Sequence, residues 1–462
     1  MMTNKAKALR YVDTNRQAFL NALKEFASIA SVSTDPEHKE DIRRAANWLV
    51  SELKRLGFDN AQTVETAGHP VVFAYTEPRL NDAPTVLIYG HYDVQPPDPY
   101  EEWENPPFSP WQKGEYLYGR GVSDMKGQVM VALKAVEAIT ATGTLPLNII
   151  WLIEGEEEIG SPNLSQFLEQ YRQLLKADVA LNLDTGMLAP DQPTITYGLR
   201  GVAAFELRVY GPDHDLHSGL FGGVVHNPAQ ALCELIAGMH DASGKVLVPG
   251  FYDHVRPLDD EERQELARLP FKEAELTRNL GVPQLYGEPE FTPIERIGAR
   301  PTLEINGLYS GYTGQGSKTI IPAWAMAKIS TRLVPDQDPE DIHQKLRAYL
   351  EANCPPTVRW ELIAFAGSPA SVTDRHHPGV RALAQALKNV WGKEPLYRRE
   401  GGSVPVVGMM QCILGLESAL SGFGLPDDHI HSPNERLHLP TWYRGIQAVV
   451  EFLMSYPDFA HS

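Results

Sequence analysis

Four short apolar runs in the N-terminal part of the chain restrict its fold more than any other feature. They are rich in β-branched residues, and a stretch with helical spacing, 128–141, separates the second run from the third. Such runs, alternating with helices, predict an α/β layer with a largely parallel sheet. The predicted strands are residues 71–75, 85–89, 147–153 and 177–183.

The residues before these strands are predicted to form two amphipathic helices. Apolar side chains recur in steps of three and four from Ile42 to Leu56. Gly57 follows them, at the position where a left-handed residue commonly ends a helix.

The pattern changes near Val202 and returns to helices and strands near His377, with a helix predicted over 380–391. Alternation over 203–210 and 327–334 indicates a second, α+β unit. A chain of 462 residues also exceeds what one hydrophobic core usually serves. We therefore predict a discontinuous first domain, 1–201 and 366–462, with a second domain, 202–365, inserted into it.

Composition excludes several classes of protein. Acidic residues outnumber basic ones by 59 to 41, and a net charge of −18 repels nucleic-acid backbones. No run approaches the roughly 18 apolar residues of a membrane span, and no secretory signal is expected. Three cysteines in unrelated contexts argue against a disulfide framework. We expect a cytoplasmic protein without nucleic-acid or membrane partners.

Two polar clusters lie in the first half of the predicted first domain. His91 and Asp93 follow the second predicted strand, at the end of a sheet where ligands bind in open α/β folds. Imidazole suits zinc, and a carboxylate can orient it, although a histidine on a surface loop is the plainer interpretation of this pair alone. Asp124 ends a glycine-rich segment before a helix, where it could equally form a turn and an N-cap.

Two further clusters add carboxylates and a second histidine. Residues 154–158 carry four glutamates directly after a buried strand, which is costly unless a cation neutralises them or the loop is exposed. Asp184 follows the next predicted strand, and His431 lies in the acidic segment 427–435. Two imidazoles and three carboxylates are the ligands that two metals sharing one carboxylate would need.

Taken in order, these motifs resemble the metal-site motifs of the dizinc exopeptidases, a family of carnosinases, cytosolic nonspecific dipeptidases, aminoacylases and succinyl-diaminopimelate desuccinylases. The motifs are His91-x-Asp93, Gly121-Val-Ser-Asp124, Glu157-Glu158, Asp184 and His431. The resemblance covers nearly the whole chain. Residues 215–219, 318–322, 332–335 and 399–403 are most similar to the carnosinase and nonspecific-dipeptidase branch.

The resemblance implies a zinc-exopeptidase-like catalytic domain, an inserted lid that forms a homodimer, and two divalent cations per subunit. Zinc is expected, and a ligand set without thiolates also tolerates manganese and cobalt. Asp124 is implied to bridge the cations. The other implied ligands are His91 and Asp184 for one cation, and Glu158 and His431 for the other.

Further roles are also implied by the resemblance. Glu157 corresponds to a general base that holds the metal-bridging water, and Asp93 to the partner of His91. The remaining glutamates of the acidic cluster, Glu154 and Glu156, are expected to complete its polar shell. The sequence departs from the family at Met125, where an aspartate or asparagine is usual. Because Met125 is not an implied ligand, we expect an intact site.

Four further residues complete the implied active site, and His217 among them lies in the predicted inserted domain. His217 is similar to a histidine that reaches the neighbouring subunit's active site, although by itself it could only brace a turn. Thr319, Arg332 and Ser403 look like the residues that hold the carboxylate end and backbone of the substrate. Without the resemblance, Arg332 could form an ordinary ion pair on a sheet surface.

We therefore expect metal-dependent hydrolysis of dipeptides or other short peptides with a free C-terminal carboxylate. Deacylation of N-acyl amino acids would use the same metals with a different specificity pocket. A non-catalytic metal-binding interaction protein is a third interpretation, against which the intact Glu157 and ligand set argue. A metal-dependent phosphoesterase would have no need for a carboxylate clamp. The preferred dipeptide and the native metal stay open.

Overall fold

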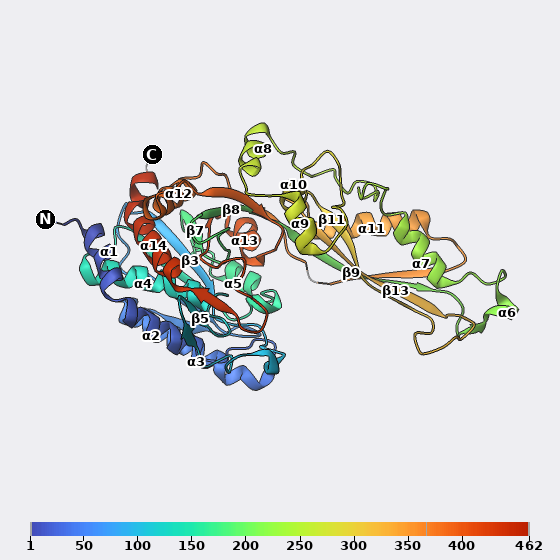
Figure 1. Ribbon diagram of the computed structural model, residues 1–462, viewed down its shortest axis with the longest axis horizontal. Helices are drawn as coiled ribbons and strands as arrows, with labels where there is room; N and C mark the ends of the chain where they lie inside the picture. The colour runs from blue at the N-terminus through green and yellow to red at the C-terminus, as the bar shows by residue number, and fades with distance from the viewer. Residues whose placement is uncertain (1, 366, 461–462) are drawn as a thin grey trace. The chain divides into compact units, whose positions relative to one another are not determined.

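Residues 2–365 and 367–460 are described by the computed structural model of this protein (Figure 1). Two compact units are present. The first unit is Met1–Tyr197, Thr373–Arg398 and Pro405–Ser462, and the second unit is Gly198–Val372 and Arg399–Val404. The predicted domain limits at residues 201 and 365 remain predictions. The limits at residues 1, 366 and 462 lie outside the described residues.

Three α-helices, not the predicted two, precede the first strand in the described residues: α1 (Asn4–Thr14), α2 (Arg16–Ala27) and α3 (Lys39–Arg55). Asn15 separates α1 from α2 because its backbone leaves the helical region, with φ −112° and ψ 14°. No proline or glycine marks that break in the sequence. The predicted pattern of α3 is correct: its apolar face is buried, and Gly57 follows with a φ of 94°.

The sheet of the first unit has four parallel strands at its centre, in the order β6-β3-β7-β17. Antiparallel strands flank them, β1 and β2 on the β6 side and β8 on the β17 side. Strands β15 and β16 pair with β8. The predicted α/β class is confirmed. The bounds are β1 Gln62–Val64, β2 Val71–Tyr75, β3 Thr85–His91, β6 Asn148–Glu154, β7 Val179–Asn182, β8 Thr194–Leu199, β15 Ser371–Val372, β16 Leu396–Glu400 and β17 Ser418–Leu420.

The central parallel strands end at the same edge of the sheet. Tyr89 of β3 pairs with Leu152 of β6 and with Asn182 of β7, and Asn182 pairs in turn with Leu420 of β17. Strand β3 runs to His91, two residues beyond the predicted end. Because the carboxyl ends are level, the segments that follow them emerge next to one another.

Helices cover this sheet. The C-terminal helix α14 (Leu439–Ala460) packs against α1, α4 (Lys126–Thr142) and α12 (Pro378–Trp391), as Figure 1 shows. Two short helices, α5 (Leu164–Gln170) and α13 (Pro405–Met409), complete the helices of the unit. Among the described residues, no helix is both long and apolar enough to cross a membrane.

A small sheet connects two distant parts of the first unit. Its strands, in the order β18-β5-β4, are Arg436–His438, Tyr116–Tyr118 and Trp111–Lys113. Arg436 pairs with Tyr118, so the segment that follows β5 and the segment that precedes β18 lie next to each other at this pair.

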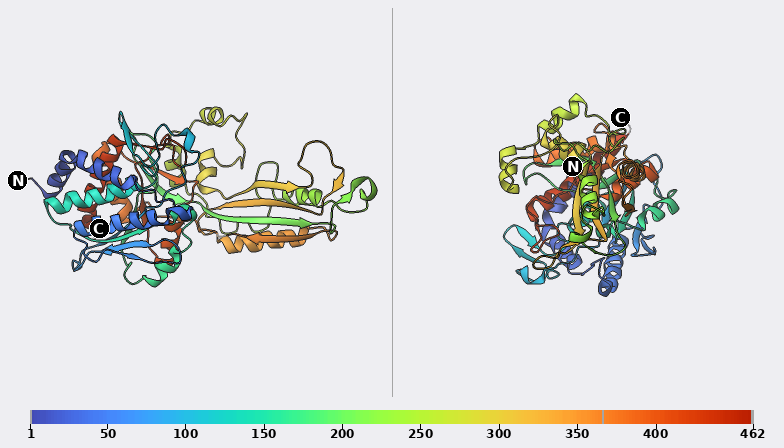
Figure 2. Two further views of the ribbon diagram at one scale, coloured as in Figure 1. Left: turned by 90° about the horizontal axis from the view of Figure 1, so that it is seen from below. Right: turned by 90° about the vertical axis from the view of Figure 1, so that its right-hand side faces the viewer.

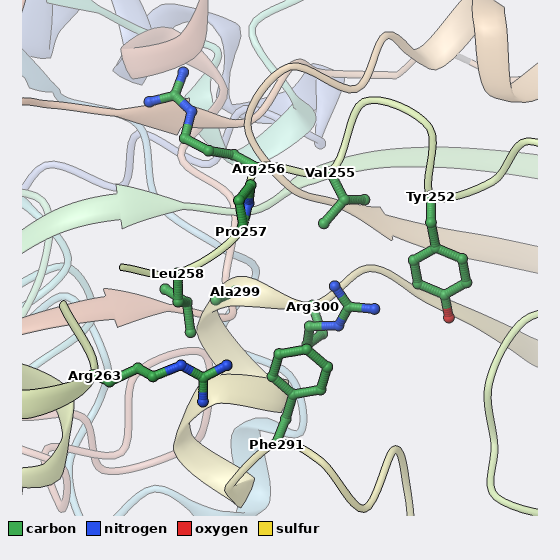
Figure 3. A pocket seen from close by; sticks show the side chains of 9 residues that line it. All are labelled: Tyr252, Val255, Arg256, Pro257, Leu258, Arg263, Phe291, Ala299 and Arg300. Carbon is green, nitrogen blue, oxygen red and sulfur yellow. The ribbon is translucent and has the colours of Figure 1, made fainter. Parts of the chain in front are cut away.

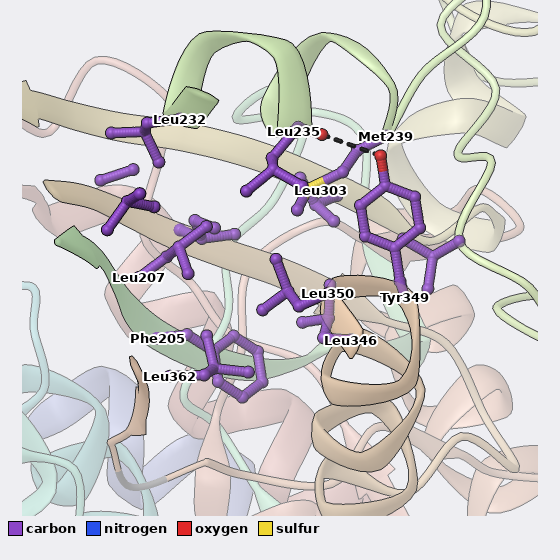
Figure 4. Close-up of a cluster of buried hydrophobic side chains, with 14 of the residues drawn as sticks. Phe205, Leu207, Leu232, Leu235, Met239, Leu303, Leu346, Tyr349, Leu350 and Leu362 are labelled. Carbon is purple, nitrogen blue, oxygen red and sulfur yellow. Dashed lines mark hydrogen bonds between the residues drawn. The ribbon is translucent and has the colours of Figure 1, made fainter. Parts of the chain in front are cut away.

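The second unit is an antiparallel sheet, in the order β11-β13-β9-β14, with helices on one face. Helices α7 (Pro228–Ala237) and α11 (Pro339–Asn353) supply the core on that face; α11 is the orange helix along the sheet in the left view of Figure 2. The buried leucines meet there, and the hydroxyl of Tyr349 donates to the carbonyl oxygen of Leu235 at 2.9 Å (Figure 4). The strands are β9 Gly201–Tyr210, β11 Thr302–Ser310, β13 Trp324–Leu333 and β14 Arg359–Ala364.

Smaller elements complete the second unit and confirm its α+β character. They include a two-stranded sheet that carries His217. Their bounds are β10 Leu216–His217, β12 Ile320–Ile321, α6 Ser218–Phe221, α8 Asp260–Ala267, α9 Glu273–Leu280 and α10 Pro293–Ala299.

Candidate metal centre

Histidine and carboxylate side chains converge where the central strands end. His91 is the last residue of β3, and its Nε2 atom lies 3.2 Å from Oδ1 of Asp124, in the loop before α4. The same nitrogen lies 3.8 Å from Oδ1 of Asp184, after β7, and 3.9 Å from Oε2 of Glu157, after β6. The level strand ends therefore produce the cluster that the sequence predicts.

His431 joins the cluster from the C-terminal part of the chain. Its Nε2 atom lies 2.9 Å from Oδ2 of Asp124 and 3.2 Å from Oε2 of Glu158. The imidazole is 52% exposed, whereas His91 is fully buried. The two carboxylate oxygens of Asp124 thus face two different histidines.

The ligand atoms in the described residues form two overlapping groups, each within 4.8 Å. One group is His91, Asp124 and Glu158, and the other is His91, Glu157 and Asp184. The two groups share His91, so their other ligand atoms gather around one imidazole. The donors are imidazole nitrogens and carboxylate oxygens without a thiolate, which suits zinc, manganese or cobalt.

Two carboxyl groups of the cluster have raised pKa values when no cation balances their charge. Burial, followed by the charges of Asp124 and Glu158, raises the pKa of Asp184 to about 7, although His91 opposes this. Burial also raises the pKa of Glu157 well above its ordinary value. Cations at these positions would supply the positive charge that bound protons otherwise supply.

Burial lowers the pKa of a histidine, but hydrogen bonds to carboxylates outweigh that effect for both histidines of the cluster. Hydrogen bonds to Asp124 and Glu158 raise the pKa of His431 to about 10. Burial disfavours charge on His91, but hydrogen bonds to Asp124 and Asp93 raise its pKa well above the ordinary value. Burial likewise favours protonation of Asp124, yet hydrogen bonds from the two histidines lower its pKa. These hydrogen bonds favour the ionised form of Asp124.

Asp93 supports the cluster in two ways. Its carbonyl oxygen lies 3.0 Å from Nδ1 of His91 and its carboxylate Oδ1 lies 3.4 Å from the same nitrogen, so both oxygens face the imidazole. Its carboxylate accepts the backbone N–H groups of Glu157 and Glu158, at 3.3 and 3.1 Å. Asp93 thereby fixes both the imidazole and the acidic loop.

Two residues that support the cluster were not predicted from the sequence. Nε2 of Gln95 donates to Oε2 of Glu158 at 2.8 Å, and the buried carboxylate of Glu435 accepts backbone N–H groups beside Asp124. Gln95 stands two residues after Asp93, and Glu435 four residues after His431. Proximity to a ligand in the sequence is the one signal that could have drawn attention to them.

The remaining glutamates of the acidic loop have their own donors, as expected. Glu154 accepts from the hydroxyls of Tyr89 and Ser161, both at 2.9 Å. Glu156 accepts from the side-chain amide of Asn163 at 2.9 and 3.0 Å. They form the polar shell of the loop.

The other predicted site residues belong to the second unit and form two pairs. His217 is adjacent to Thr319, since the N–H of Ser218 donates to the carbonyl of Thr319 at 3.0 Å. Nη1 of Arg332 donates to Oγ of Ser403, also at 3.0 Å. Within the described residues, no hydrogen bond joins one pair to the other.

Figure 3 shows a different hollow in the second unit, with a volume of about 170 Å³. It contains none of the predicted site residues. Two of its arginines form ion pairs, Arg300 with Glu288 at 2.7 Å and Arg263 with Glu295 at 2.6 Å. Because these pairs neutralise the cationic lining, we assign no ligand to this cavity.

The family model and the sequence relatives point to the same family of metallopeptidases. Residues 87–455 match the model of peptidase family M20/M25/M40. The Cys-Gly metallodipeptidase DUG1 of Candida albicans is 33% identical over 96% of both chains. The human Beta-Ala-His dipeptidase is 30% identical over 97% of this chain and 92% of its own. The resemblance inferred from the sequence motifs is confirmed.

Solved structures agree with the sequence relatives. An M20 family metallo-carboxypeptidase from Sulfolobus solfataricus superposes with a TM-score of 0.85 at 35% identity, over 95% of this chain and 99% of its own. The dipeptidase Dug1p from Saccharomyces cerevisiae gives a TM-score of 0.81 at 28% identity, over 99% of both chains.

Proposed function

This chain belongs to peptidase family M20/M25/M40 and is a metallopeptidase that hydrolyses dipeptides; from that premise we propose the roles of its individual side chains. The preferred substrates are dipeptides or other short peptides with a free C-terminal carboxylate. Cys-Gly and β-Ala-His, after the names of the relatives, are the first to test. Deacylation of N-acyl amino acids is not favoured by these relatives.

The proposed cation site would hold two divalent ions, with Asp124 offering one carboxylate oxygen to each. His91 and Asp184 complete one position. Glu158 and His431 complete the other, an assignment that the 3.2 Å separation of their side chains supports. Cations held by these residues would lower the pKa of a shared water and polarise the carbonyl of the substrate.

Glu157 is the proposed general base. Its Oε2 lies 3.9 Å from Nε2 of His91, about as far as Oδ1 of Asp184 at 3.8 Å, so the role of base rests on the resemblance and not on this distance. Burial raises its pKa, so its oxygen holds a proton readily. Glu157 takes the proton of the attacking water and passes it to the nitrogen of the leaving amine.

His217 is proposed to stabilise the negative charge on the carbonyl oxygen. Its Nδ1 accepts the N–H of Gly219 at 3.0 Å, which places the imidazole proton on Nε2. The side chain is exposed, so Nε2–H can donate to a substrate. The hydrogen bond from Gly219 braces the turn, and it also leaves Nε2–H of His217 as the donor.

Arg332 is proposed to bind the carboxylate end of the substrate, with Ser403 and Thr319. The side chain projects from the face of β13 opposite the hydrophobic core, where buried and partly exposed residues alternate. Only its Nη1 has a hydrogen-bond partner in the described residues, which leaves donors for a bidentate contact with a carboxylate.

We also propose a cytoplasmic homodimer in which residues 202–365 form the contact and His217 serves the partner's active site. The three cysteines are all free among the described residues, which suits a reducing compartment. The homodimer itself is proposed from the resemblance to the dizinc exopeptidases.

The single observation that supports the function most is the geometry of Asp124 between two histidines. A panel of Cys-Gly, β-Ala-His, an N-acetyl amino acid and a nitrophenyl phosphate tests it, each assayed before and after chelation. We expect hydrolysis of the dipeptides only, its loss on chelation, and its recovery with zinc or manganese. A C-terminally amidated dipeptide is the matched control for the carboxylate contact. Full activity in protein shown metal-free by elemental analysis contradicts the proposal.

A further inference from the structure

Glu435 is fully buried, four residues after His431, and its carboxylate accepts four hydrogen bonds. Oε1 accepts the backbone N–H groups of Ser123 and Asp124, at 2.9 and 3.1 Å. Oε2 accepts the N–H of Gly121 at 2.9 Å and Nη1 of Arg120 at 2.8 Å. All four donors belong to the loop that presents Asp124.

This loop has no secondary structure of its own to satisfy those groups. Residues 119–125 lie in turns, and Gly121 adopts a φ of 80°, which only glycine adopts readily. The backbone N–H groups that a helix or strand would pair instead point at one carboxylate. A charged acceptor forms stronger hydrogen bonds than a neutral one and suits several donors at once.

The same carboxylate is attached to the segment that carries His431. The N–H of Gly119 donates to the carbonyl oxygen of Glu435 at 3.0 Å, and Arg436 pairs with Tyr118 in the small sheet. The loop before α4 and the segment 431–435 are thereby joined at both backbone and side chain. Asp124 and His431, the residues at the ends of these two segments, meet at 2.9 Å.

We propose that Glu435 is the positioning residue of the cation site: by binding the loop of Asp124 it holds the two carboxylate oxygens toward different histidines. Its carboxylate contacts Arg120 and the backbone of the loop, so it acts through Asp124. The inference rests on the proposed function, since it takes Asp124 to be the shared ligand.

A glutamine tests this because it keeps the size of the side chain and changes one acceptor into a donor. In Glu435→Gln, an NH₂ group faces two of the four donors, so half of the contacts become repulsive. Outer-shell partners of metal ligands commonly contribute about 10- to 100-fold to metal affinity. We expect a loss of that size for both cations, because both depend on the orientation of Asp124.

Asp428→Asn is the matched control. Asp428 is also fully buried and also contacts the loop, but through the side-chain hydroxyl of Ser123, at 2.9 Å, and not through the backbone of Asp124. We expect this variant to bind cations as the parent does.

The experiment titrates Co²⁺ into chelated, dialysed full-length protein. Visible absorption reports the coordination of each ion, and paramagnetic resonance reports magnetic coupling of the pair through a shared carboxylate. We expect Glu435→Gln to bind both ions more weakly, with an altered spectrum and loss of coupling. Thermal unfolding of the chelated proteins shows separately how far each variant is destabilised.

Parent-like affinity, spectrum and coupling in Glu435→Gln would overturn the inference, as would an equal loss in Asp428→Asn. If Glu435→Gln does not fold, Glu435→Asp keeps the charge but shortens the side chain by one methylene, and unchanged Co²⁺ binding in it has the same meaning. A parent that binds no coupled pair contradicts the proposed function and this inference together. If the parent binds the coupled pair and Glu435→Gln binds it equally well, only this inference is contradicted.

Discussion

Oδ2 of Asp124 lies 2.9 Å from Nε2 of His431, although 307 positions separate the two residues in the sequence. Oδ1 of the same carboxylate lies 3.2 Å from Nε2 of His91. One side chain therefore connects the ligands of two proposed cation positions, and its removal should have a different effect from the removal of any other ligand.

The first prediction concerns cation stoichiometry. Asp124→Ala should bind almost no zinc, because both positions lose a ligand, whereas Asp184→Ala should keep about one of the two ions. Elemental analysis after dialysis measures this directly. Glu169→Gln, a change at an exposed acid on α5, is the control and should bind as the parent does. Equal zinc content in the two alanine variants would show that Asp124 is not shared.

The second prediction separates the adjacent glutamates. Glu157→Gln should retain both cations and lose about 100- to 10,000-fold in kcat, the usual contribution of a general base. Glu158→Gln should instead bind less metal, because it replaces a ligand. Steady-state kinetics and metal analysis on the same preparations test both. Similar metal loss in the two variants would refute the division of roles.

The third prediction is a pH dependence of stability. Burial, followed by the charge of Asp93, raises the pKa of Glu154 from 4.5 to about 8. The folded chain thus binds this proton more tightly than the unfolded chain. The stability due to that proton is fully present below about pH 4.5 and is lost as the pH rises to about 8.

Glu154→Gln should remove that contribution to the slope. In the chelated protein, the free energy of unfolding of the variant, minus that of the parent, should increase from pH 5 to pH 8. Each pKa unit corresponds to at most about 1.4 kcal/mol. Urea unfolding at several pH values gives this difference, with Glu169→Gln as the exposed control. A difference that does not change with pH would mean that Glu154 binds its proton equally in both states.

The fourth prediction is that His217 acts in the partner's active site. Glu157→Gln and His217→Ala should each be nearly inactive alone. After subunit exchange, half of the dimers are mixed, and one of their two sites carries neither change. About a quarter of the parental activity should then return if the sites act independently.

Mixing two preparations of the same variant is the control, and mass spectrometry of differently labelled chains verifies the exchange. No recovery despite verified exchange would confine His217 to its own subunit.

The positions of His91 and Asp184 could be predicted from the sequence because strand ends are visible in it. Apolar runs marked β3 and β7, and parallel strands place the residues after them at one edge. His431 had no such signal. Its backbone φ is 59°, in a loop where neither helical nor strand periodicity applies. The neighbouring carboxylates made it a candidate ligand, and the resemblance assigned its role.

The supporting residues could not be predicted for a related reason. Gln95 and Glu435 act through contacts with a carboxylate and with backbone N–H groups, and such contacts leave no periodic pattern. The break between α1 and α2 at Asn15 also lacks a proline or glycine. Interactions with the main chain depend on the folded path and not on the order of side chains.

Strand β17 lies between β7 and β8, yet it is synthesised long after both. A nascent chain on the ribosome must therefore leave the place between those neighbours open until residues 418–420 have emerged. Most of the second unit, Gly198–Val372, is complete by then and can fold first. Residues 418–435 supply a central strand, the proposed ligand His431 and Glu435 together, so a chain that stops before them lacks both the strand and part of the proposed cation site.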